Sequence, residues 1–153
     1  PRVHRSVSAS SRWPDAVPTP PALRHAFDLT VDVAPTHRIG HGDGELLEFT
    51  PIVGGVVTGP MLHGTVEPFG GDWSTSRRGV CSLEARYLIR AADGTTIDIV
   101  NRGVWRERDG YFRTSPEFRT DSAEHRWLTE HVFVGDAADD GPDRILIRMY
   151  LVE

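Results

Sequence analysis

The chain has 153 residues, 39% of them hydrophobic and 25% charged, an ordinary composition for one globular domain with its own core. The formal net charge of -5 argues against a nucleic-acid-binding protein, and no segment approaches the roughly 18 apolar residues of a membrane span. The single cysteine, Cys81, excludes an intramolecular disulfide and, with the lack of a signal-peptide pattern, predicts a cytoplasmic protein.

The first segment, residues 1–22, is rich in Ser and Pro, has no apolar periodicity and is predicted to be a disordered arm. The arm is basic, because residues 1–24 hold four arginines against the single acidic residue Asp15. It could fold back on the domain, bind a partner or remain a solvated tail. The folded domain is predicted to span residues 23–153.

Alternation of apolar and polar residues is the main structural pattern in the rest of the chain. In residues 27–33 the alternation is strict, which predicts a half-buried strand. Further β segments follow at short intervals, without a long helix. The predicted strands are 27–33, 46–53, 55–66, 80–91, 95–106, 111–114, 127–134 and 144–152.

Turn residues separate these strands. Gly59-Pro60 predicts a bend or bulge within one strand, and Gly70-Gly71-Asp72-Trp73 is typical of a turn. Asp93-Gly94 and Asp109-Gly110 each lie between two β segments, which is a strong hairpin pattern. About eight short strands at this spacing predict a single antiparallel barrel or sandwich, and a barrel is favoured because closure leaves no exposed sheet edge. Longer connections are expected at 34–45, at 116–125 with a short helical turn, and at 136–143.

The Asp93-Gly94 turn predicts a polar wall on its hairpin. If these two residues form the loop, then Glu84, Arg86 and Asn101 share one face of the sheet and Tyr87 lies on the other. Neither face is wholly apolar, and polar groups placed among apolar ones are typical of ligand sites. The alternative is that the three polar residues form a cross-strand ladder on the solvent face.

Two carboxylates are candidates for acid–base chemistry. Burial would raise the pKa of Glu84 and the neighbouring Arg86 would lower it, so this carboxyl could act as a base or an acid. Asp72, next to Trp73, could place a carboxylate and an indole at the barrel mouth. The alternative for the second pair is turn chemistry, with Asp72 capping backbone donors and Trp73 plugging the barrel end.

Four further residues are candidates for the pocket wall. His63 lies within a predicted strand, and histidine is the usual proton shuttle near neutral pH. Tyr111 and Arg113 alternate onto one face of a strand and could line the pocket together with Trp127. Each has a plainer interpretation as an exposed, packed or surface side chain.

Metal ions and nucleotide cofactors are not expected. His37, His41 and Asp43 have a suggestive spacing, but they lie in a glycine-rich loop and no His-Glu-x-x-His motif exists. The chain has no nucleophile elbow, no phosphate-binding loop followed by Lys and no dinucleotide fingerprint. We therefore predict that the protein works without a cofactor.

A set of short motifs in a fixed order resembles the bacterial and fungal family known as domain of unknown function 3237, from about Pro20 to the end. The motifs are Ile52-Val53-Gly54-Gly55, Gly59-Pro60, Gly64-Thr65-Val66, Gly70-Gly71-Asp72-Trp73, Leu83-Glu84-Ala85-Arg86-Tyr87, Asp93-Gly94, Asn101-Arg102-Gly103, Tyr111-Phe112-Arg113-Thr114 with Pro116 and Phe118, and Trp127-Leu128 ahead of Phe133-Val134-Gly135.

The resemblance implies a lipocalin-like barrel, often found as a homodimer. Some relatives lie among enzymes of secondary metabolism or aromatic degradation, which implies a small hydrophobic ligand. This sequence departs from the family at three positions: Glu84 stands where Asp is frequent, and His125 and Thr129 stand where Tyr and Asn are expected. If the family pocket uses these positions, its chemistry is specialised here.

Three functions remain open at the level of sequence. The first is a cofactor-independent enzyme that holds a polyketide-like or aromatic substrate in the barrel and catalyses cyclisation, isomerisation or a related proton transfer. The second is a carrier of a small hydrophobic molecule, and the third is an accessory scaffold. In the first, Glu84 or Asp72 moves the proton, and the predicted substrate-binding residues are Arg86, Asn101, Tyr87, Trp73, His63, Tyr111, Arg113 and Trp127.

Overall fold

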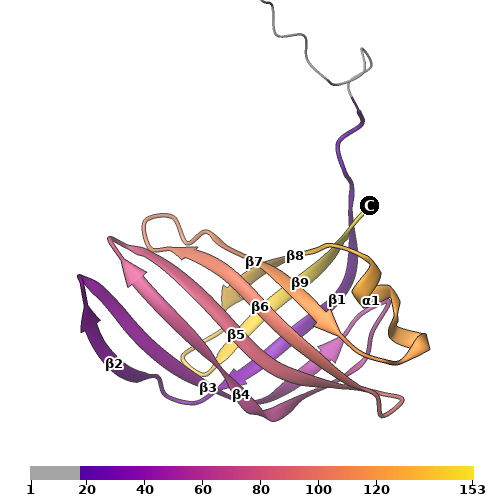
Figure 1. Cartoon of the computed structure of the whole chain (residues 1–153), viewed down its shortest axis with the longest axis horizontal. Coiled ribbons are helices and arrows are strands. Elements are labelled where there is room, and N and C mark those ends of the chain that lie inside the picture. The colour runs from indigo at the N-terminus through magenta and orange to yellow at the C-terminus, as the bar shows by residue number, and fades with distance from the viewer. Residues whose placement is uncertain (1–17) are drawn as a thin grey trace, which may run out of the picture.

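The computed structural model describes residues 18–153, and most of them lie in β-strands (Figure 1). The strands are β1 (Leu23–Val33), β2 (His37–Gly42), β3 (Glu45–Thr58), β4 (Gly64–Arg77), β5 (Val80–Ala91), β6 (Thr96–Arg106), β7 (Phe112–Arg119), β8 (Phe133–Asp139) and β9 (Arg144–Val152). A short 3₁₀ turn (Ala123–His125) and the one-turn helix α1 (Trp127–Glu130) join β7 to β8. The all-β class predicted from alternation is confirmed.

The strands close into an antiparallel barrel. Each strand from β3 to β9 pairs with its neighbour in the chain, and β1 pairs with both β9 and β3. These eight strands form the wall, and β2 is added to the free half of β3. In Figure 1, β2 lies at one end of the barrel and α1 at the other. Closure satisfies backbone hydrogen bonds that an open sheet would expose at its edges.

The interior is apolar toward the α1 end. Strand β7 illustrates how the sequence produces this interior. Its residues alternate strictly between buried and exposed, so every second side chain points inward. Phe27, Phe118 and Phe133 pack edge to face or tilted, with ring centroids 5.2–6.5 Å apart, and Trp127 of α1 covers them. Each such buried aromatic contributes about 1.5–3 kcal/mol through burial. The helix therefore closes this end of the barrel with side chains.

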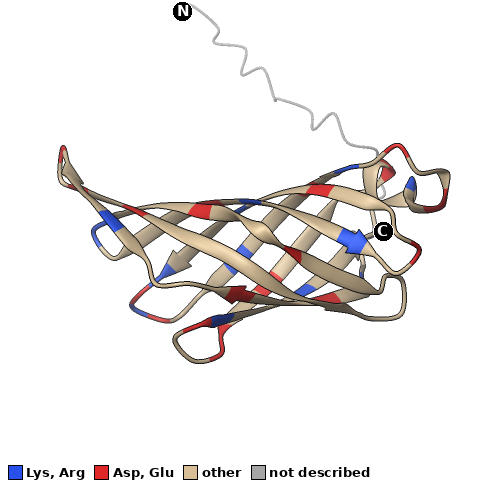
Figure 2. Cartoon of the chain, turned by 90° about the horizontal axis from the view of Figure 1, so that it is seen from below, with Lys and Arg blue, Asp and Glu red and all other residues tan. Residues whose placement is uncertain are grey.

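Most of the charged residues lie on the outer surface and in the turns. Figure 2 shows acidic and basic positions interspersed along the strands. Among residues 18–153 every arginine is exposed except Arg106, which is partly buried and hydrogen-bonds Asp109. No helix in this part of the chain is long and apolar enough to cross a membrane.

The register predicted for the β5–β6 hairpin is wrong by one residue. Glu84 lies opposite Arg102, and Ala85 rather than Arg86 lies opposite Asn101. The loop has three residues instead of two, because Gly94 N–H donates to Ala91 O (2.9 Å) and Gly94 adopts φ +89°. A type I turn followed by a left-handed glycine is the usual three-residue hairpin, and it shifts the pairing by one position. The shift separates Asn101 from the face of Glu84 and Arg86.

Several predicted boundaries also differ. Residues 70–73 form part of β4 instead of a turn, because Gly70 and Gly71 fit close to neighbouring strands. The chain turns at residues 59–63, so a single strand covers 45–58. The predicted strand 127–134 divides into α1 and the start of β8, and the predicted loop 34–45 contains β2. The predicted arm, residues 1–22, lies mostly outside the described residues.

Candidate functional site

The barrel interior contains four polar side chains whose atoms lack a hydrogen-bond partner among the described residues. They are Asp72, Tyr87, Asn101 and Thr114, and the unpaired atoms are Oδ1, OH, Oδ1 and Oγ1 respectively. Asn101 is 1% exposed, Tyr87 3% and Thr114 5%. A buried polar atom without a partner costs about 1–3 kcal/mol, so natural proteins keep few of them without a reason. Four of them on one interior wall make this wall the candidate site.

Strand register places two of these side chains on one level of the barrel. Asp72 on β4 lies opposite Ala85 on β5, and Ala85 lies opposite Asn101 on β6. The Cα atoms of Asp72 and Asn101 are therefore two strand spacings, about 10 Å, apart. Ala85 has the smallest side chain that an L residue can place between them, so no bulky side chain separates the two polar groups.

Tyr87 lies one inward position further along β5, opposite Gly70 of β4. Glycine is required there, since a Cβ on Gly70 would lie 2.4 Å from Arg86 O and 2.9 Å from Tyr87 Cβ, and its φ is +116°. The carboxylate of Asp72 acts electrostatically on the Tyr87 phenol. These two groups therefore belong to one site.

Thr114 on β7 lies one inward position away from the Asn101 level, because Asn101 pairs with Pro116 and Thr114 pairs with Gly103. It lies between two inward-facing glycines, Gly103 of β6 and Gly135 of β8. A Cβ on Gly135 would lie 2.1 Å from Thr114 Oγ1, and a Cβ on Gly103 would lie 2.8 Å from Thr114 Cγ2. Because neither glycine has a Cβ, the threonine side chain fits between them.

The acid–base properties of the interior site follow from its burial. Burial raises the pKa of Asp72 to about 6, and a backbone hydrogen bond from Glu84 opposes this rise. Burial also raises the pKa of Tyr87 well above its usual value, and the nearby Asp72 carboxylate adds to the effect. Near neutral pH the site therefore holds a carboxylate with appreciable basicity beside a phenol that keeps its proton.

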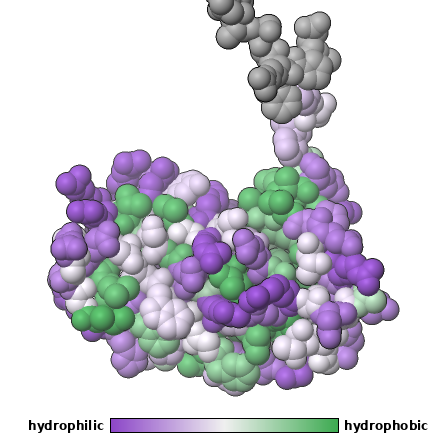
Figure 3. All heavy atoms as spheres, in the orientation of Figure 1, coloured by the Kyte–Doolittle hydropathy of each residue, from purple (hydrophilic) through white to green (hydrophobic). Residues whose placement is uncertain are grey.

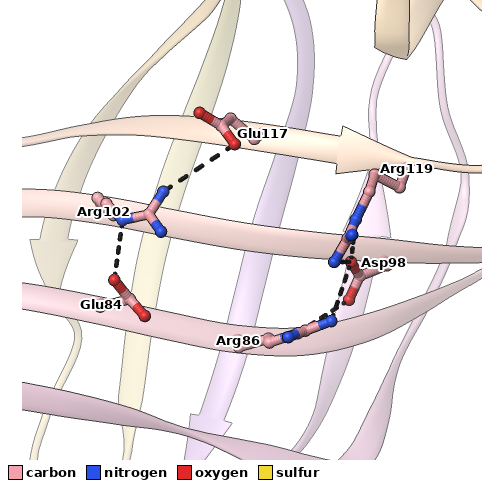
Figure 4. Close-up of polar contacts among 6 residues, drawn as sticks. All are labelled: Glu84, Arg86, Asp98, Arg102, Glu117 and Arg119. Carbon is pink, nitrogen blue, oxygen red and sulfur yellow. Dashed lines mark hydrogen bonds and ion pairs between the residues drawn. The ribbon is translucent and has the colours of Figure 1, made fainter.

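The predicted carboxylate–guanidinium wall lies outside the barrel. Figure 4 shows Glu84 and Arg86 on the outer face of β5, with their partners on β6 and β7. Arg102 donates to Glu84 (2.8 Å) and approaches Glu117 (4.0 Å), whereas Asp98 bridges Arg86 (3.3 Å) and Arg119 (2.7 Å). Most of these side chains are half exposed, which makes each pair worth less than about 1 kcal/mol. Glu84 and Arg86 thus form the exposed ladder, and Asn101 does not belong to it.

A surface cleft of about 610 Å³ lies beside this ladder, where β7 runs past α1. Its rim carries Arg86, Arg102 and Arg119, and its floor includes Pro116 and Leu128. The cleft exists because β7 pairs with β8 only at residues 113 and 114. Figure 3 shows hydrophilic and hydrophobic residues interspersed on this face.

The remaining predicted residues are not brought together with the interior site. Trp73 points outward and packs against Phe49 in a tilted arrangement, with ring centroids 4.7 Å apart. Tyr111 is also outside, where Arg106 and Arg113 lie over its ring at 4.1 and 5.2 Å. His63 is exposed in the turn before β4, and Trp127 belongs to the aromatic cluster at the α1 end.

Sequence reasoning missed Thr114 and singled out Asp72 for a different reason. The missed pattern is the strict alternation of β7, in which Thr114 is the one polar residue among Phe112, Pro116 and Phe118. A polar residue at an inward position of such a strand is a usable indicator of an interior site. Over residues 18–153 no group of three or more His, Cys, Asp and Glu side chains is arranged to hold a metal ion.

A carboxylate, a phenol, an amide and a hydroxyl on one inner wall can bind and orient a molecule that carries hydroxyl and carbonyl groups. The ionised carboxylate accepts a proton or a hydrogen bond, and the phenol and the amide NH₂ donate to oxygen. The surrounding wall excludes bulk water, which strengthens each of these interactions. The arrangement has the components of proton-transfer catalysis.

Comparison with known proteins gives one family. The model described as "Protein of unknown function (DUF3237)" matches residues 21–110 and 106–152. A UPF0311 protein of Bradyrhizobium diazoefficiens is 33% identical over 84% of this chain and 95% of its own length. A UPF0311 protein of Clostridium acetobutylicum is 34% identical over 82% of this chain and 90% of its own length.

Solved structures share the fold. A conserved protein of unknown function from Rhodopseudomonas palustris superposes with a TM-score of 0.82 at 30% identity, over 90% of this chain and 100% of its own. A β-barrel-like protein from Acinetobacter baumannii superposes with a TM-score of 0.83 at 26% identity, over 90% of this chain and 99% of its own. A protein from Penicillium herquei described as an enzyme superposes with a TM-score of 0.75 at 23% identity, over 90% of this chain and 98% of its own. At this identity the likeness shows a shared fold alone.

Proposed function

Since this chain belongs to the DUF3237 family, a family of β-barrel proteins, we propose that its barrel binds a small aromatic or polyketide-like molecule and catalyses a proton-transfer reaction on it without a cofactor. The reaction class is isomerisation or cyclisation. The observation that carries the proposal is the interior group of Asp72, Tyr87, Asn101 and Thr114, each with a polar atom left without a partner within the described chain.

Asp72 is the proton acceptor in this proposal. Its pKa of about 6 leaves it ionised near neutral pH and more basic than an ordinary aspartate. It removes a proton from a hydroxyl group, or from a carbon next to a carbonyl, and the resulting negative charge collects on substrate oxygen. Protonated Asp72 then returns the proton at the new position, so the enzyme ends the cycle unchanged.

Tyr87 and Asn101 stabilise the negative charge that develops. The phenol of Tyr87 keeps its proton because burial raises its pKa, so it donates a hydrogen bond to an oxyanion. The amide of Asn101 donates from the next strand, and the hydroxyl of Thr114 orients the substrate from β7. Removing one donor of this kind typically lowers kcat about 10²-fold or more.

One solved structure of this fold supports catalysis as a class of function. A barrel of this fold from Penicillium herquei is described as an enzyme, so the fold can carry catalysis. Fold likeness assigns no residue and no substrate. The roles of the four side chains therefore depend on their geometry here.

The test is a comparison of Asp72→Asn with Asp32→Asn across a panel of polyketide-like and aromatic substrates. Asp32 pairs with Arg144 on the outer surface and serves as the matched control. Turnover is expected to fall at least about 10²-fold in Asp72→Asn, with KM changed less, and to stay near wild type in the control. Wild-type activity is expected to rise with pH around a midpoint of about 6.

Glu84→Gln distinguishes the interior site from the outer ladder. If the chemistry is inside the barrel, loss of the Glu84 charge removes only an exposed ion pair and turnover persists. A loss of turnover confined to Glu84→Gln would move the active site to the outer cleft and contradict the proposal.

A non-catalytic carrier would use the same interior group. The same unpaired atoms favour it, because they require a bound molecule and do not require a reaction. Tight binding of a compound that is recovered unchanged, with equal affinity in wild type and Asp72→Asn, would favour the carrier over the enzyme. The homodimer implied by the family resemblance is a separate prediction that size-exclusion chromatography with light scattering tests.

A further inference from the structure

The interior site holds one carboxylate, Asp72, that has no cation beside it within the described residues. Asp72 faces the interior from β4, and register places Glu48 of β3 on the same inner face, opposite Ser74. Among residues 18–153 no arginine is buried, and the sequence contains no lysine. Within the described chain, Asp72 therefore has no cationic partner, whereas Glu48 has Arg38 opposite it on β2.

The nearest candidates for a balancing cation are engaged elsewhere. Arg38 of β2 pairs with Glu48, but it is exposed, hydrogen-bonds His41 and lies two strands away from Asp72. His125 bonds Asp93 in the β5–β6 loop (2.8 Å), and His131 bonds the Trp127 carbonyl (2.8 Å). Both lie with the connection that closes the α1 end, away from the level of Asp72 and Asn101.

The free groups of the site also define what a ligand must offer. Ionised Asp72 can only accept hydrogen bonds, so a group that contacts its unpaired Oδ1 must be a donor. Tyr87 and Thr114 carry hydroxyls that donate or accept, and Asn101 carries one group of each kind. Trp105 and Phe112, paired across β6 and β7 at inward positions, add flat apolar surface next to Thr114.

We propose that the interior site selects uncharged, hydroxyl-bearing ring compounds and rejects anions such as carboxylates, sulfonates and phosphates. This inference rests on the proposed function and adds to it the charge class of the ligand. A hydroxyl directed at Asp72 donates to its free oxygen and is also the proton that the carboxylate can remove. An anionic group at that place meets a carboxylate with no balancing cation.

The expected size of the selection follows from Coulomb's law. With an effective dielectric constant of about 20, like charges about 6 Å apart repel by an amount equivalent to roughly a hundredfold in affinity. Partial solvent access to Asp72 reduces this figure, so we expect at least about tenfold. The arginines of the outer ladder, Arg86, Arg102 and Arg119, lie beyond the wall and are paired with acids, so they do not reverse the sign.

The test compares two probes of one size, 2-naphthol and 2-naphthalenesulfonate, by isothermal titration calorimetry with the full chain at about pH 8. The sulfonate stays ionised at every pH used, and the naphthol stays neutral. We expect the naphthol to bind at least about tenfold more tightly than the sulfonate to the wild-type protein. Equal binding of the two probes, or tighter binding of the sulfonate, would overturn the charge selection.

Two further measurements assign the selection to Asp72. In Asp72→Asn the sulfonate is expected to bind at least about fivefold more tightly than in wild type, while the control Asp32→Asn leaves both affinities unchanged. In wild type at about pH 4.5, where Asp72 is protonated, the difference between the probes is expected to shrink. A difference that is unaffected by both the variant and the pH would contradict a role for this carboxylate.

The outcomes separate the inference from the function on which it rests. If neither probe binds at millimolar concentration, and neither do the other neutral ring compounds of the substrate panel, then the interior is not a ligand site and both proposals fail. If the sulfonate binds as well as the naphthol and Asn101→Leu weakens both, the interior site stands and only the charge selection fails.

Discussion

Two carboxylates that look alike in sequence have opposite environments in the barrel. The sequence predicts Asp72 in a turn next to Trp73 and Glu84 in a strand next to Leu83, and both are plausible acid–base groups. The structure buries Asp72 without a counter-ion and leaves Glu84 half exposed beside Arg102. Because a pKa depends on solvation and neighbouring charge, only the buried carboxyl is tuned toward neutral pH.

The burial of Asp72 predicts a pH-dependent effect of Asp72→Asn on stability. The folded-state pKa, about 6, lies above the ordinary value of 3.8, so the folded protein holds this proton more tightly than the unfolded chain does. Wild-type stability therefore falls relative to the variant as pH rises from about 4 to 6 and is level above that range. We expect the variant to be more stable by up to ~3 kcal/mol at pH 8, with no difference below pH 4, in urea unfolding. A difference that does not change with pH would contradict this.

Close packing at Gly135 predicts a second effect at the residue scale. In Gly135→Ala the new Cβ would meet Thr114 Oγ1 at 2.1 Å, so we expect a loss of about 1–3 kcal/mol in the free energy of unfolding. The double variant Gly135→Ala/Thr114→Ala removes that oxygen and is expected to recover much of the loss, with a coupling of at least about 1 kcal/mol by a double-mutant cycle. Additive losses would show that the contact is not the cause.

At the scale of elements, the β5–β6 loop decides which residues reach the interior. Its third residue, Gly94, adds one position to the loop and moves Asn101 to the inner face opposite Ala85. Asp93 stabilises the loop, because its carboxylate accepts hydrogen bonds from Thr95 N–H (3.0 Å) and from His125 Nε2 (2.8 Å). The hairpin thus connects the polar interior with the segment that closes the α1 end.

The conformation of Gly94 predicts how the loop tolerates substitution. A Cβ at this position meets nothing within 4 Å, so the cost of Gly94→Ala is conformational and arises from φ +89°. We expect a loss of about 1–2 kcal/mol in the free energy of unfolding for Gly94→Ala. Gly94→Asn is expected to cost less, because asparagine tolerates the left-handed region. Equal costs for the two variants in thermal or urea unfolding would contradict the assigned loop.

At the scale of the whole molecule, the described residues form a barrel that closes on itself. Beyond the ladder, Ala22 and Glu153 exchange backbone hydrogen bonds of 3.2 and 2.8 Å, so both ends of residues 22–153 meet at one place. The two ends of the barrel differ: one is filled with aromatic side chains beneath α1, and the polar group lies further inside. The proposed ligand site therefore begins at Tyr87, on the level of Phe118, and extends away from the helix to Thr114.

The closed sheet predicts that the basic arm is dispensable for folding and for the interior site. Deletion of residues 1–19 is expected to leave the melting temperature within a few degrees of the full chain and naphthol affinity within about twofold. Differential scanning fluorimetry and calorimetry measure both. Loss of naphthol binding on deletion would mean that the arm contributes to the site, and loss of a protein partner would favour the scaffold hypothesis for the arm.

The sequence alone determined the all-β class, the meander of short strands and the position of the hairpin turns. These follow from period-2 alternation and from Gly, Asp and Pro at turns, which are local properties. It also singled out Asp72, Tyr87 and Asn101, although in an arrangement that differs from the real one.

Only the tertiary structure decided which side chains share the interior. Asp-Gly is compatible with loops of two or three residues, and that difference of one residue exchanges the faces of β5 and β6 relative to each other. Glu84 thereby stays outside with Arg102, while Asn101 joins Asp72 and Thr114 inside. The grouping depends on pairing between strands that are distant in sequence, and on a burial that shifts the Asp72 pKa only once the barrel has closed.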